Sequence, residues 1–289
     1  MHQRQNLTGW IFLLPATLLI VWMSFYPMVR AFIVSLMRGK PTALEFSDPL
    51  WRNYQRITMD AVFIQSLKNT FTYLIIQVPV MLVLALIFAS LLNMKDLKFK
   101  GLFRTCIFLP CATALVSYSI IFRTLFAYDG FINAILMNLH ILSEPINWLN
   151  DPMGARAVII IALIWRWTGY NMVFYLSSMQ SIDYSVYESA RIDGASSFTQ
   201  LTKITIPLLK PVILVTAIMS TNGTLQLYDE SVNLTNGGPA NASITMSHYI
   251  YNTTFVTSPN FGYAAAMSFV ILIMVAVLSA IQMKVGDKR

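Results

Sequence analysis

Six long stretches of apolar residues alternate with shorter polar segments along the chain. A helix that crosses a bilayer needs roughly 17–25 mostly apolar residues, and each stretch has about that length. A single span in lipid must satisfy its own backbone hydrogen bonds, so all six are predicted to be α-helices. The stretches are Gly9–Val29, Thr70–Leu92, Thr105–Phe122, Ala157–Met179, Pro207–Tyr228 and Phe261–Met283. The pattern predicts an all-α integral membrane protein with six transmembrane helices.

The composition leads to the same conclusion. Of the 289 residues, 56% are hydrophobic and only 11% are charged. Soluble domains are about 25% charged, so this chain has too few charges to cover a water-facing surface. Soluble enzymes, disordered chains and disulfide scaffolds are therefore excluded, and Cys106 and Cys111 are interpreted as small packing residues. The run Gly9–Val29 is longer than a signal-peptide core, which indicates a retained first helix.

The distribution of lysine and arginine between the spans predicts the orientation in the membrane. Ten basic residues fall on one side: Arg4, Lys95, Lys98, Lys100, Arg104, Arg191, Lys203, Lys284, Lys288 and Arg289. The opposite side has Arg123 and Arg156 in the third connection and none in the fifth, although the first connection holds five. We expect both termini in the cytoplasm. This sorting explains the net charge of +7 without a nucleic-acid partner.

The sequence lacks the common motifs of catalytic and metal sites. It has no G-x-x-x-x-G-K-[ST] phosphate-binding loop, no H-E-x-x-H and no C-x-x-C. The three histidines, His2, His140 and His248, are too scattered to suggest a shared metal ion. We therefore expect a non-catalytic chain that has no catalytic residue, no cofactor and no metal.

The polar connection between the fourth and fifth stretches carries the most specific pattern. It reads Y-E-S-A-R-I-D-G-A-S-S-F from Tyr187 to Phe198 and continues to Ile204-Thr205-Ile206-Pro207. Small residues and glycine allow another surface to approach closely, and proline fits the first turn of a helix. Taken alone, the residues are consistent with a short cytoplasmic helix containing a glycine break, or with an ordinary amphipathic loop.

The spacing in this connection resembles the E-A-A-x3-G-x9-I-x-L-P signature of permease subunits of bacterial type I ABC importers. The matching positions are Glu188, Ala190, Gly194, Ile204 and Pro207, whereas Ser189 and Ile206 depart from the signature. Further segments resemble the carbohydrate-uptake branch: Ser66–Thr70, Phe103-Arg104 with Leu109-Pro110, Ile146–Leu149 and Leu234–Pro239. Within that branch the chain is similar to the maltose-type and glycerol-phosphate-type first permease subunits.

The resemblance implies a fold, a set of partners and a contact region. The fold would be that of a type I importer permease in the bacterial cytoplasmic membrane, with an N-terminal helix and outer loop over residues 1–65 and a core over 66–289. The partners would be a second homologous permease, two cytoplasmic ATPase subunits that hydrolyse ATP, and an extracytoplasmic sugar-binding protein. A coupling helix at 190–198 would contact the ATPase. The implied contact residues are Glu188, Ala190, Arg191, Asp193, Gly194, Ala195, Phe198 and Pro207.

Polar and aromatic residues of the fourth and fifth stretches are candidates for the substrate path. A charge such as Arg166 in the middle of a span costs about 2.5–3.5 kcal/mol on insertion scales, so it should face protein or a water-filled cavity. Sugar sites combine aromatic faces with amides and hydroxyls, and by resemblance Tyr170 matches a sugar-contacting tyrosine. The candidates are Arg166, Trp167, Tyr170, Asn171, Asn222, Thr224, Gln226 and Tyr228. Interhelical hydrogen bonds and interfacial aromatics remain the alternative interpretation.

The leading hypothesis is a permease subunit that moves a sugar, either an oligosaccharide or a sugar derivative, across the membrane. An ABC permease for a non-sugar solute, such as an amino acid or a peptide, is the alternative within the family. A stand-alone secondary transporter or channel is disfavoured because the spans have few carboxylates for ion coupling and no visible repeat. A membrane-embedded enzyme is disfavoured by the missing catalytic constellation.

Overall fold

The computed structural model describes residues 2–40, 42–257 and 259–286, and most of them are helical. The chain forms two compact units. One consists of the residues up to Asp60 together with Ile250–Leu272, and the other consists of Ala61–Tyr249 together with the residues from Ile273 onwards. Lys288 and Arg289, which were used to predict the orientation, lie outside the described residues.

The first unit contains a long apolar helix and a small hairpin. Its elements are α1 (His2–Ile20), the π-helical turn η1 (Val21–Phe25), α2 (Tyr26–Ser35), β1 (Met37–Lys40), β2 (Ala43–Phe46), α3 (Arg52–Met59), η4 (Asn252–Val256) and the first part of α13 (Phe261–Gly286). Proline has no backbone N–H to donate to the helical hydrogen bonds, and the wider turn η1 ends at Phe25, two residues before Pro27. The apolar helical segment Phe12–Ser35 is long enough to cross a membrane, as predicted.

The boundary between the units differs from the predicted division at residues 65 and 66. The chain leaves α3 at Asp60, which has an extended backbone. Tyr263 Oη then donates a hydrogen bond of 2.7 Å to Asp60 Oδ2, and the Arg56 guanidinium lies 4.2 Å from the centre of the Tyr263 ring. These contacts connect the start of α13 with α3, which explains why Ile250–Leu272 joins the N-terminal unit.

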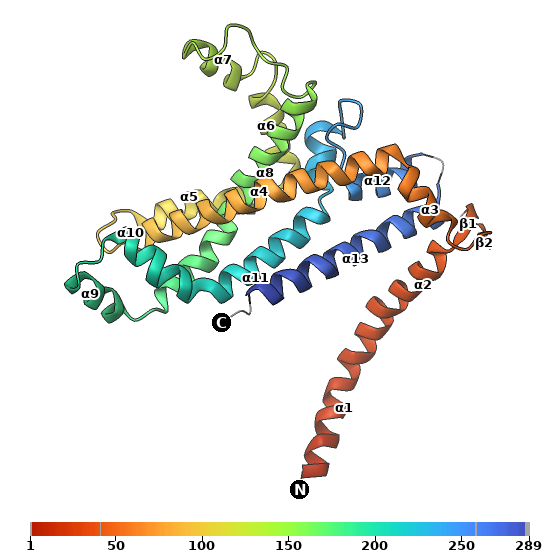
Figure 1. Ribbon diagram of the computed structural model, residues 1–289, viewed down its shortest axis with the longest axis horizontal. Helices are drawn as coiled ribbons and strands as arrows, with labels where there is room; N and C mark the ends of the chain where they lie inside the picture. Colours follow the sequence, from red (N-terminus) through yellow and green to blue (C-terminus); the bar gives the residue numbers. More distant parts are fainter. Residues whose placement is uncertain (1, 41, 258, 287–289) are drawn as a thin grey trace. The chain divides into compact units, whose positions relative to one another are not determined.

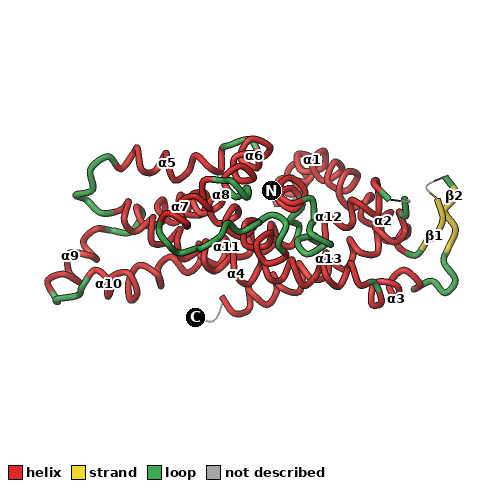
Figure 2. Tube along the Cα trace, turned by 90° about the horizontal axis from the view of Figure 1, so that it is seen from above, coloured by secondary structure: helices red, strands yellow, loops and turns green. Residues whose placement is uncertain are grey.

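The second unit is a helical bundle. Its elements are α4 (Ala61–Asn93), α5 (Lys100–Ala112), α6 (Leu115–Leu125), α7 (Phe131–Asn138), α8 (Pro152–Gln180), α9 (Tyr184–Ile192), α10 (Ser197–Gln200), η2 (Leu201–Thr205), α11 (Ile206–Leu225), η3 (Ser231–Thr235), α12 (Met246–Tyr251) and the end of α13. Helices α4, α8 and α11 pack against one another (Figures 1 and 2). Figure 1 shows α9 and α10 at the left end of this bundle, and α7 above it, beyond α6.

The predicted third span is not one straight helix. It divides into α5 and α6, which meet at an angle of 99°. Pro110 lies in the last turn of α5, and both Thr113 and Ala114 have extended backbone angles that end the helix. Among the described residues, five helices are long and apolar enough to cross a membrane, and the number rises to six if the bent pair counts as one span. The prediction of an all-α membrane protein is confirmed.

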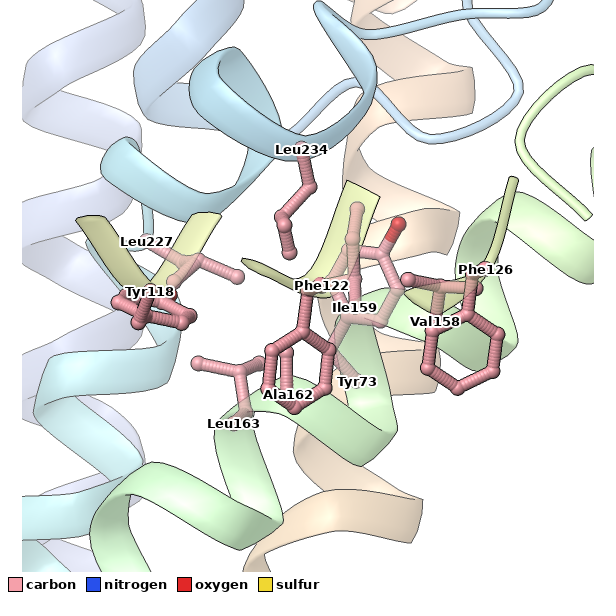
Figure 3. Close-up of a cluster of buried hydrophobic side chains, with 10 residues drawn as sticks. All are labelled: Tyr73, Tyr118, Phe122, Phe126, Val158, Ile159, Ala162, Leu163, Leu227 and Leu234. Carbon is pink, nitrogen blue, oxygen red and sulfur yellow. The ribbon is translucent and has the colours of Figure 1, made fainter. Parts of the chain in front are cut away.

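A cluster of buried side chains joins α6 to α8 and α4 (Figure 3). Tyr118, Phe122 and Phe126 come from α6 and its end, and Val158 and Ile159 come from α8; Figure 3 shows Phe126 beside Val158 and Tyr118 beside Leu227. Aromatic residues bury large areas and prefer offset or edge-to-face contacts, and Tyr118 and Phe122 meet edge to face at 5.9 Å. This packing holds α6, the helix that follows the bend, against α8 and α4.

Helices α5 and α8 approach each other most closely at Gly169. A Cβ atom at this position would overlap the Ile107 carbonyl oxygen and would lie 2.9 Å from the Phe108 Cα atom. Small residues at helix interfaces in membranes allow this kind of backbone approach. Gly169 therefore sets the distance between the two helices, and in the sequence it lies between Trp167 and Tyr170, two of the residues predicted to line the substrate path.

Candidate functional site

A cavity of about 340 Å³ lies within the second unit, between α4, α8 and the end of α11. Its lining is rich in polar and aromatic side chains. They are Gln77, Arg166, Trp167, Tyr170, Asn171, Ser220, Thr224, Gln226, Tyr228, Asp229 and Glu230. A compact, partly apolar cavity with a few converging polar groups is typical of a small-molecule site.

Helix geometry explains why α8 contributes several neighbouring residues to this wall. Arg166, Trp167, Tyr170 and Asn171 lie at positions i, i+1, i+4 and i+5, which share one face of a helix. Trp167 and Tyr170 pack edge to face with their ring centres 5.7 Å apart. Asn171 donates hydrogen bonds to the Trp167 carbonyl oxygen at 3.0 Å and to Met81 Sδ at 3.6 Å. The wall thus combines an aromatic surface with an anchored amide.

The opposite wall is formed where α11 ends. The helix stops at Leu225, before the predicted end of the span at Tyr228, and Gln226 caps it through a backbone hydrogen bond to Asn222. Thr224 Oγ1 donates a hydrogen bond of 3.0 Å to Gln77 Oε1 on α4. From Gln226 to Tyr228 the chain continues along the cavity as irregular backbone, and Asp229 and Glu230 follow in the helical turn that leads into η3 (Ser231–Thr235). Gln226, Tyr228, Asp229 and Glu230 bring polar side chains into the lining.

A charged pair closes one part of the cavity wall. Arg166 Nη1 lies 3.9 Å from Glu230 Oε1, and the two side chains are 13% and 6% exposed. The guanidinium also lies 4.6 Å from the centre of the Tyr118 ring. Burial raises the pKa of the Glu230 carboxyl above its ordinary value, whereas the charge of Arg166 acts in the opposite direction. Glu230, rather than its neighbour Asp229, pairs with Arg166.

Seven of the eight predicted path residues line this cavity. Asn222 is the exception, because its side-chain oxygen accepts a hydrogen bond of 3.2 Å from Ser279 of α13 and so takes part in helix packing. Gln77 and Glu230 also line the cavity but were not among the predicted residues. Gln77 carries the single amide side chain in the run Thr70–Leu92, a signal that the sequence contains.

The second candidate region follows α8 at the end of the bundle. Asp183 caps α9 by accepting a hydrogen bond of 3.0 Å from the Ser185 backbone N–H, which lowers the pKa of Asp183. Helix α9 ends at Ile192, and Gly194 follows with a φ of +77°, a conformation that favours glycine. A further turn leads to α10.

The predicted coupling helix at 190–198 is therefore not one helix. Its first residues belong to α9, its centre is the turn around Gly194, and its last residues begin α10. Pro207 lies in the first turn of α11, as expected, but it does not open the helical segment. The helical segment already starts at Ser197, and the π-helical turn η2 comes directly before Ile206 and Pro207. The glycine break was expected, but it separates two helices.

Most of the predicted contact residues are accessible. Glu188, Arg191, Asp193, Gly194, Phe198 and Pro207 are exposed, and Ala190 and Ala195 are half-buried. Ile192, which was not singled out, is 86% exposed, and Phe198 is 75% exposed. Two apolar side chains this open to solvent on a polar segment indicate an interaction surface.

Side-chain contacts fasten α9 to the segments around it. Lys95 Nζ, in the connection between α4 and α5, lies 3.2 Å from the centre of the Tyr184 ring, and Arg191 donates a hydrogen bond of 2.9 Å to Tyr184 Oη. Tyr187 Oη lies 3.0 Å from Thr205 Oγ1 of η2. A second, open cavity of about 900 Å³ is lined by these same segments.

Within the described residues, no group of three or more histidine, cysteine, aspartate or glutamate side chains is arranged to hold a metal ion. The two free cysteines, Cys106 and Cys111, lie on α5 and form no disulfide. The geometry of the chain thus offers a polar, aromatic cavity within a helical bundle. At one end of the bundle it also offers a mostly exposed segment formed by α9, the turn at Gly194 and α10, called here the docking segment.

Comparison with known proteins assigns the chain to a family. A 50% identical relative, the lactose transport system permease protein LacF of Rhizobium radiobacter, aligns over 98% of this chain and 95% of its own length. The arabinooligosaccharides transport system permease protein AraP of Halalkalibacterium halodurans is 31% identical over 96% of this chain and 87% of its own. A bacterial alginate ABC transporter, crystallised with an alginate pentasaccharide-bound periplasmic protein, matches the fold with a TM-score of 0.82 and 21% identity over 99% of this chain and 96% of the matched chain.

The family profile of the binding-protein-dependent transport system inner membrane component matches residues 60–287. This range includes nearly all of the second unit and the part of the first unit from Ile250 to Leu272. Its start coincides with the boundary at Asp60 that separates α3 from α4. The match agrees with several apolar helices that are long enough to cross the membrane. This chain is a multi-pass protein of the cytoplasmic membrane, and it belongs to the family of inner membrane components of binding-protein-dependent transport systems.

Proposed function

We propose that this chain is a permease subunit that translocates a sugar through the cavity between α4, α8 and the end of α11. The observation that carries the proposal is the edge-to-face pair of Trp167 and Tyr170 opposite the Thr224–Gln77 hydrogen bond. Aromatic rings pack on the C–H faces of a sugar, while amides and hydroxyls replace the hydrogen bonds that its hydroxyls lose with water. The names of the relatives, a lactose and an arabinooligosaccharides permease, support an uncharged saccharide or oligosaccharide.

The driving force in this proposal comes from partner subunits. Two cytoplasmic ATPases hydrolyse ATP, a second homologous permease completes the path, and an extracytoplasmic binding protein delivers the sugar. The chain has no phosphate-binding loop of its own, and the apolar side chains of Ile192 and Phe198 are exposed on the docking segment. The alginate transporter, solved in complex with a periplasmic protein, supports this architecture.

The path proposal is tested by truncating the two side chains that face the cavity from different helices. Tyr170→Ala and Gln226→Ala should each reduce uptake of lactose by about tenfold, equivalent to about 1.4 kcal/mol, because each removes a sugar contact. Uptake is measured in proteoliposomes that contain the whole transporter. Tyr128→Ala, at an exposed tyrosine outside the cavity, is the matched control. Normal uptake and selectivity in both cavity variants would contradict the proposed path.

The proposed orientation places the docking segment in the cytoplasm and the hairpin of the first unit outside. Single cysteines are introduced in a background with Cys106 and Cys111 replaced by serine. In spheroplasts, a membrane-impermeant thiol reagent should label Glu45→Cys and leave Ser189→Cys unlabelled until the cells are opened. Both positions are exposed, so accessibility within the chain does not limit the reaction. Strong labelling of Ser189→Cys from outside would reverse the topology and remove the docking segment from the ATPase.

A further inference from the structure

The buried pair of Arg166 and Glu230 is not a complete hydrogen-bonded ion pair. The separation of 3.9 Å between Nη1 and Oε1 is beyond hydrogen-bond range. Within the described part of the chain, Arg166 Nε and Nη1 are buried and have no hydrogen-bond partner. Both residues line the cavity. Charged donors that remain unsatisfied in a buried site are costly, so this arrangement points to a ligand group that satisfies them.

The chemistry of the pair defines which ligand group fits. A guanidinium offers donors only, and an ionised carboxylate offers acceptors only. A hydroxyl accepts from the first and donates to the second, and two neighbouring hydroxyls of a sugar ring can bridge the pair. A carboxylate or phosphate on the ligand could accept from Arg166, but it has no proton to give to Glu230.

Asp229, the third charged residue of the cavity wall, also favours an uncharged ligand. The charged side chains of the lining are one cation, Arg166, and two carboxylates, Asp229 and Glu230, which sum to one negative charge when all are ionised. An acidic ligand would add a further negative charge beside Glu230 in a site of low dielectric constant, where like charges repel strongly. An uncharged ligand meets no such repulsion.

We infer that Arg166 and Glu230 form a hydroxyl-binding pair that makes the cavity selective for uncharged sugars over sugars that carry a carboxylate. The inference rests on the proposed function, because it assigns the substrate class of the same cavity. Glu230 is then a specificity-determining residue that touches the sugar, and Arg166 is its partner in that contact.

The test measures binding to the purified transporter without its binding protein, so that only the membrane cavity selects. The two probes are methyl β-D-galactoside and methyl β-D-galacturonide, which differ only in the carboxylate at C6. Quenching of tryptophan fluorescence reports binding, since Trp167 lines the cavity. Trp167→Phe identifies the share of the signal that comes from this residue.

The wild-type protein should bind the galactoside at least tenfold more tightly than the galacturonide. Glu230→Gln should reverse or abolish this preference, because it removes the carboxylate and leaves Arg166 free to bind the acidic probe. Asp229→Asn is the matched control, since it removes one negative charge from the same wall at a residue that does not pair with Arg166. It should keep a preference of at least threefold.

The outcomes separate the inference from the proposed path. Equal affinity of the wild type for both probes, or an equal loss of selectivity in Asp229→Asn and Glu230→Gln, would overturn the role of the pair while leaving a sugar-binding cavity. If neither probe quenches the wild-type protein, the sugar path itself is wrong and the inference falls with it. Elution of each variant from gel filtration as the intact complex shows that a loss of binding is not a loss of fold.

Discussion

Replacing Gly169 by valine should leave little folded permease in the membrane. The new Cβ atom would overlap the carbonyl oxygen of Ile107, and its nearest neighbours are backbone atoms of α5 that cannot rotate away. Overpacking typically costs about 1–3 kcal/mol, and a backbone obstacle places this change at the upper end or beyond. Two measurements report the effect: the yield of monodisperse protein after detergent extraction, and the temperature at which the monodisperse fraction disappears on heating.

Gly101→Val is the matched control for this prediction. Gly101 lies in the first turn of α5, and a Cβ atom there meets nothing within 4 Å. Both substitutions carry the same helix-propensity change, so the difference between them reports the packing of α8 on α5. Equal yields and equal thermal stabilities of the two variants would mean that the close approach at Gly169 is not required.

Replacing Gly194 by tryptophan should abolish sugar uptake while leaving the permease inserted. Within the described chain nothing lies within 4 Å of a Cβ atom at this position, so the protein leaves open space where the new side chain begins. The added volume can meet resistance only from a docked partner, and misplaced volume in a packed interface costs about 1–3 kcal/mol. We expect weaker binding of the ATPase, or ATP hydrolysis that the loaded binding protein no longer stimulates.

The positive φ of Gly194 requires a control of its own. A left-handed backbone costs most L-residues roughly 1–2 kcal/mol, but asparagine adopts it more readily. Gly194→Asn therefore tests the backbone strain with little added volume, and it should retain most of the uptake. Normal uptake and normal stimulation of ATP hydrolysis in Gly194→Trp would show that this turn does not contact the ATPase.

The membrane spans could be predicted from the sequence because their signal is local. A run of about 20 apolar residues has few alternatives to a helix in lipid, and the observed helices α4, α8 and α13 cover three predicted stretches in full. The bend between α5 and α6 was missed because hydropathy does not report direction. Pro110 was visible in the sequence, but a proline in a span is often accommodated without a bend.

The part of the candidate site that could be predicted from the sequence is the wall formed by one face of α8. Arg166 was predicted from the cost of its charge, and Trp167, Tyr170 and Asn171 were predicted as polar and aromatic residues of the same span, Tyr170 also by resemblance. Helical spacing places all four on one face, and all of them line the cavity. Glu230 was not among the predicted path residues, because its position depends on where α11 ends. Asn222 could not be assigned to cavity or interface from the sequence, since its partner Ser279 lies 57 residues away.

The attachment of α9 has a mechanical consequence. The ring of Tyr184 under Lys95, the contact of Tyr187 with Thr205, and the hydrogen bond of 2.9 Å from Gln200 Nε2 to the Ala195 carbonyl oxygen fix the segment at three points. A load applied to its exposed face would therefore be passed on as displacement rather than absorbed by bending. The load would arrive at two places at once, the cytoplasmic end of α4 and the start of the helical segment that leads into α11. Those are two of the helices whose side chains line the cavity, so a single stiff element can act on both walls together.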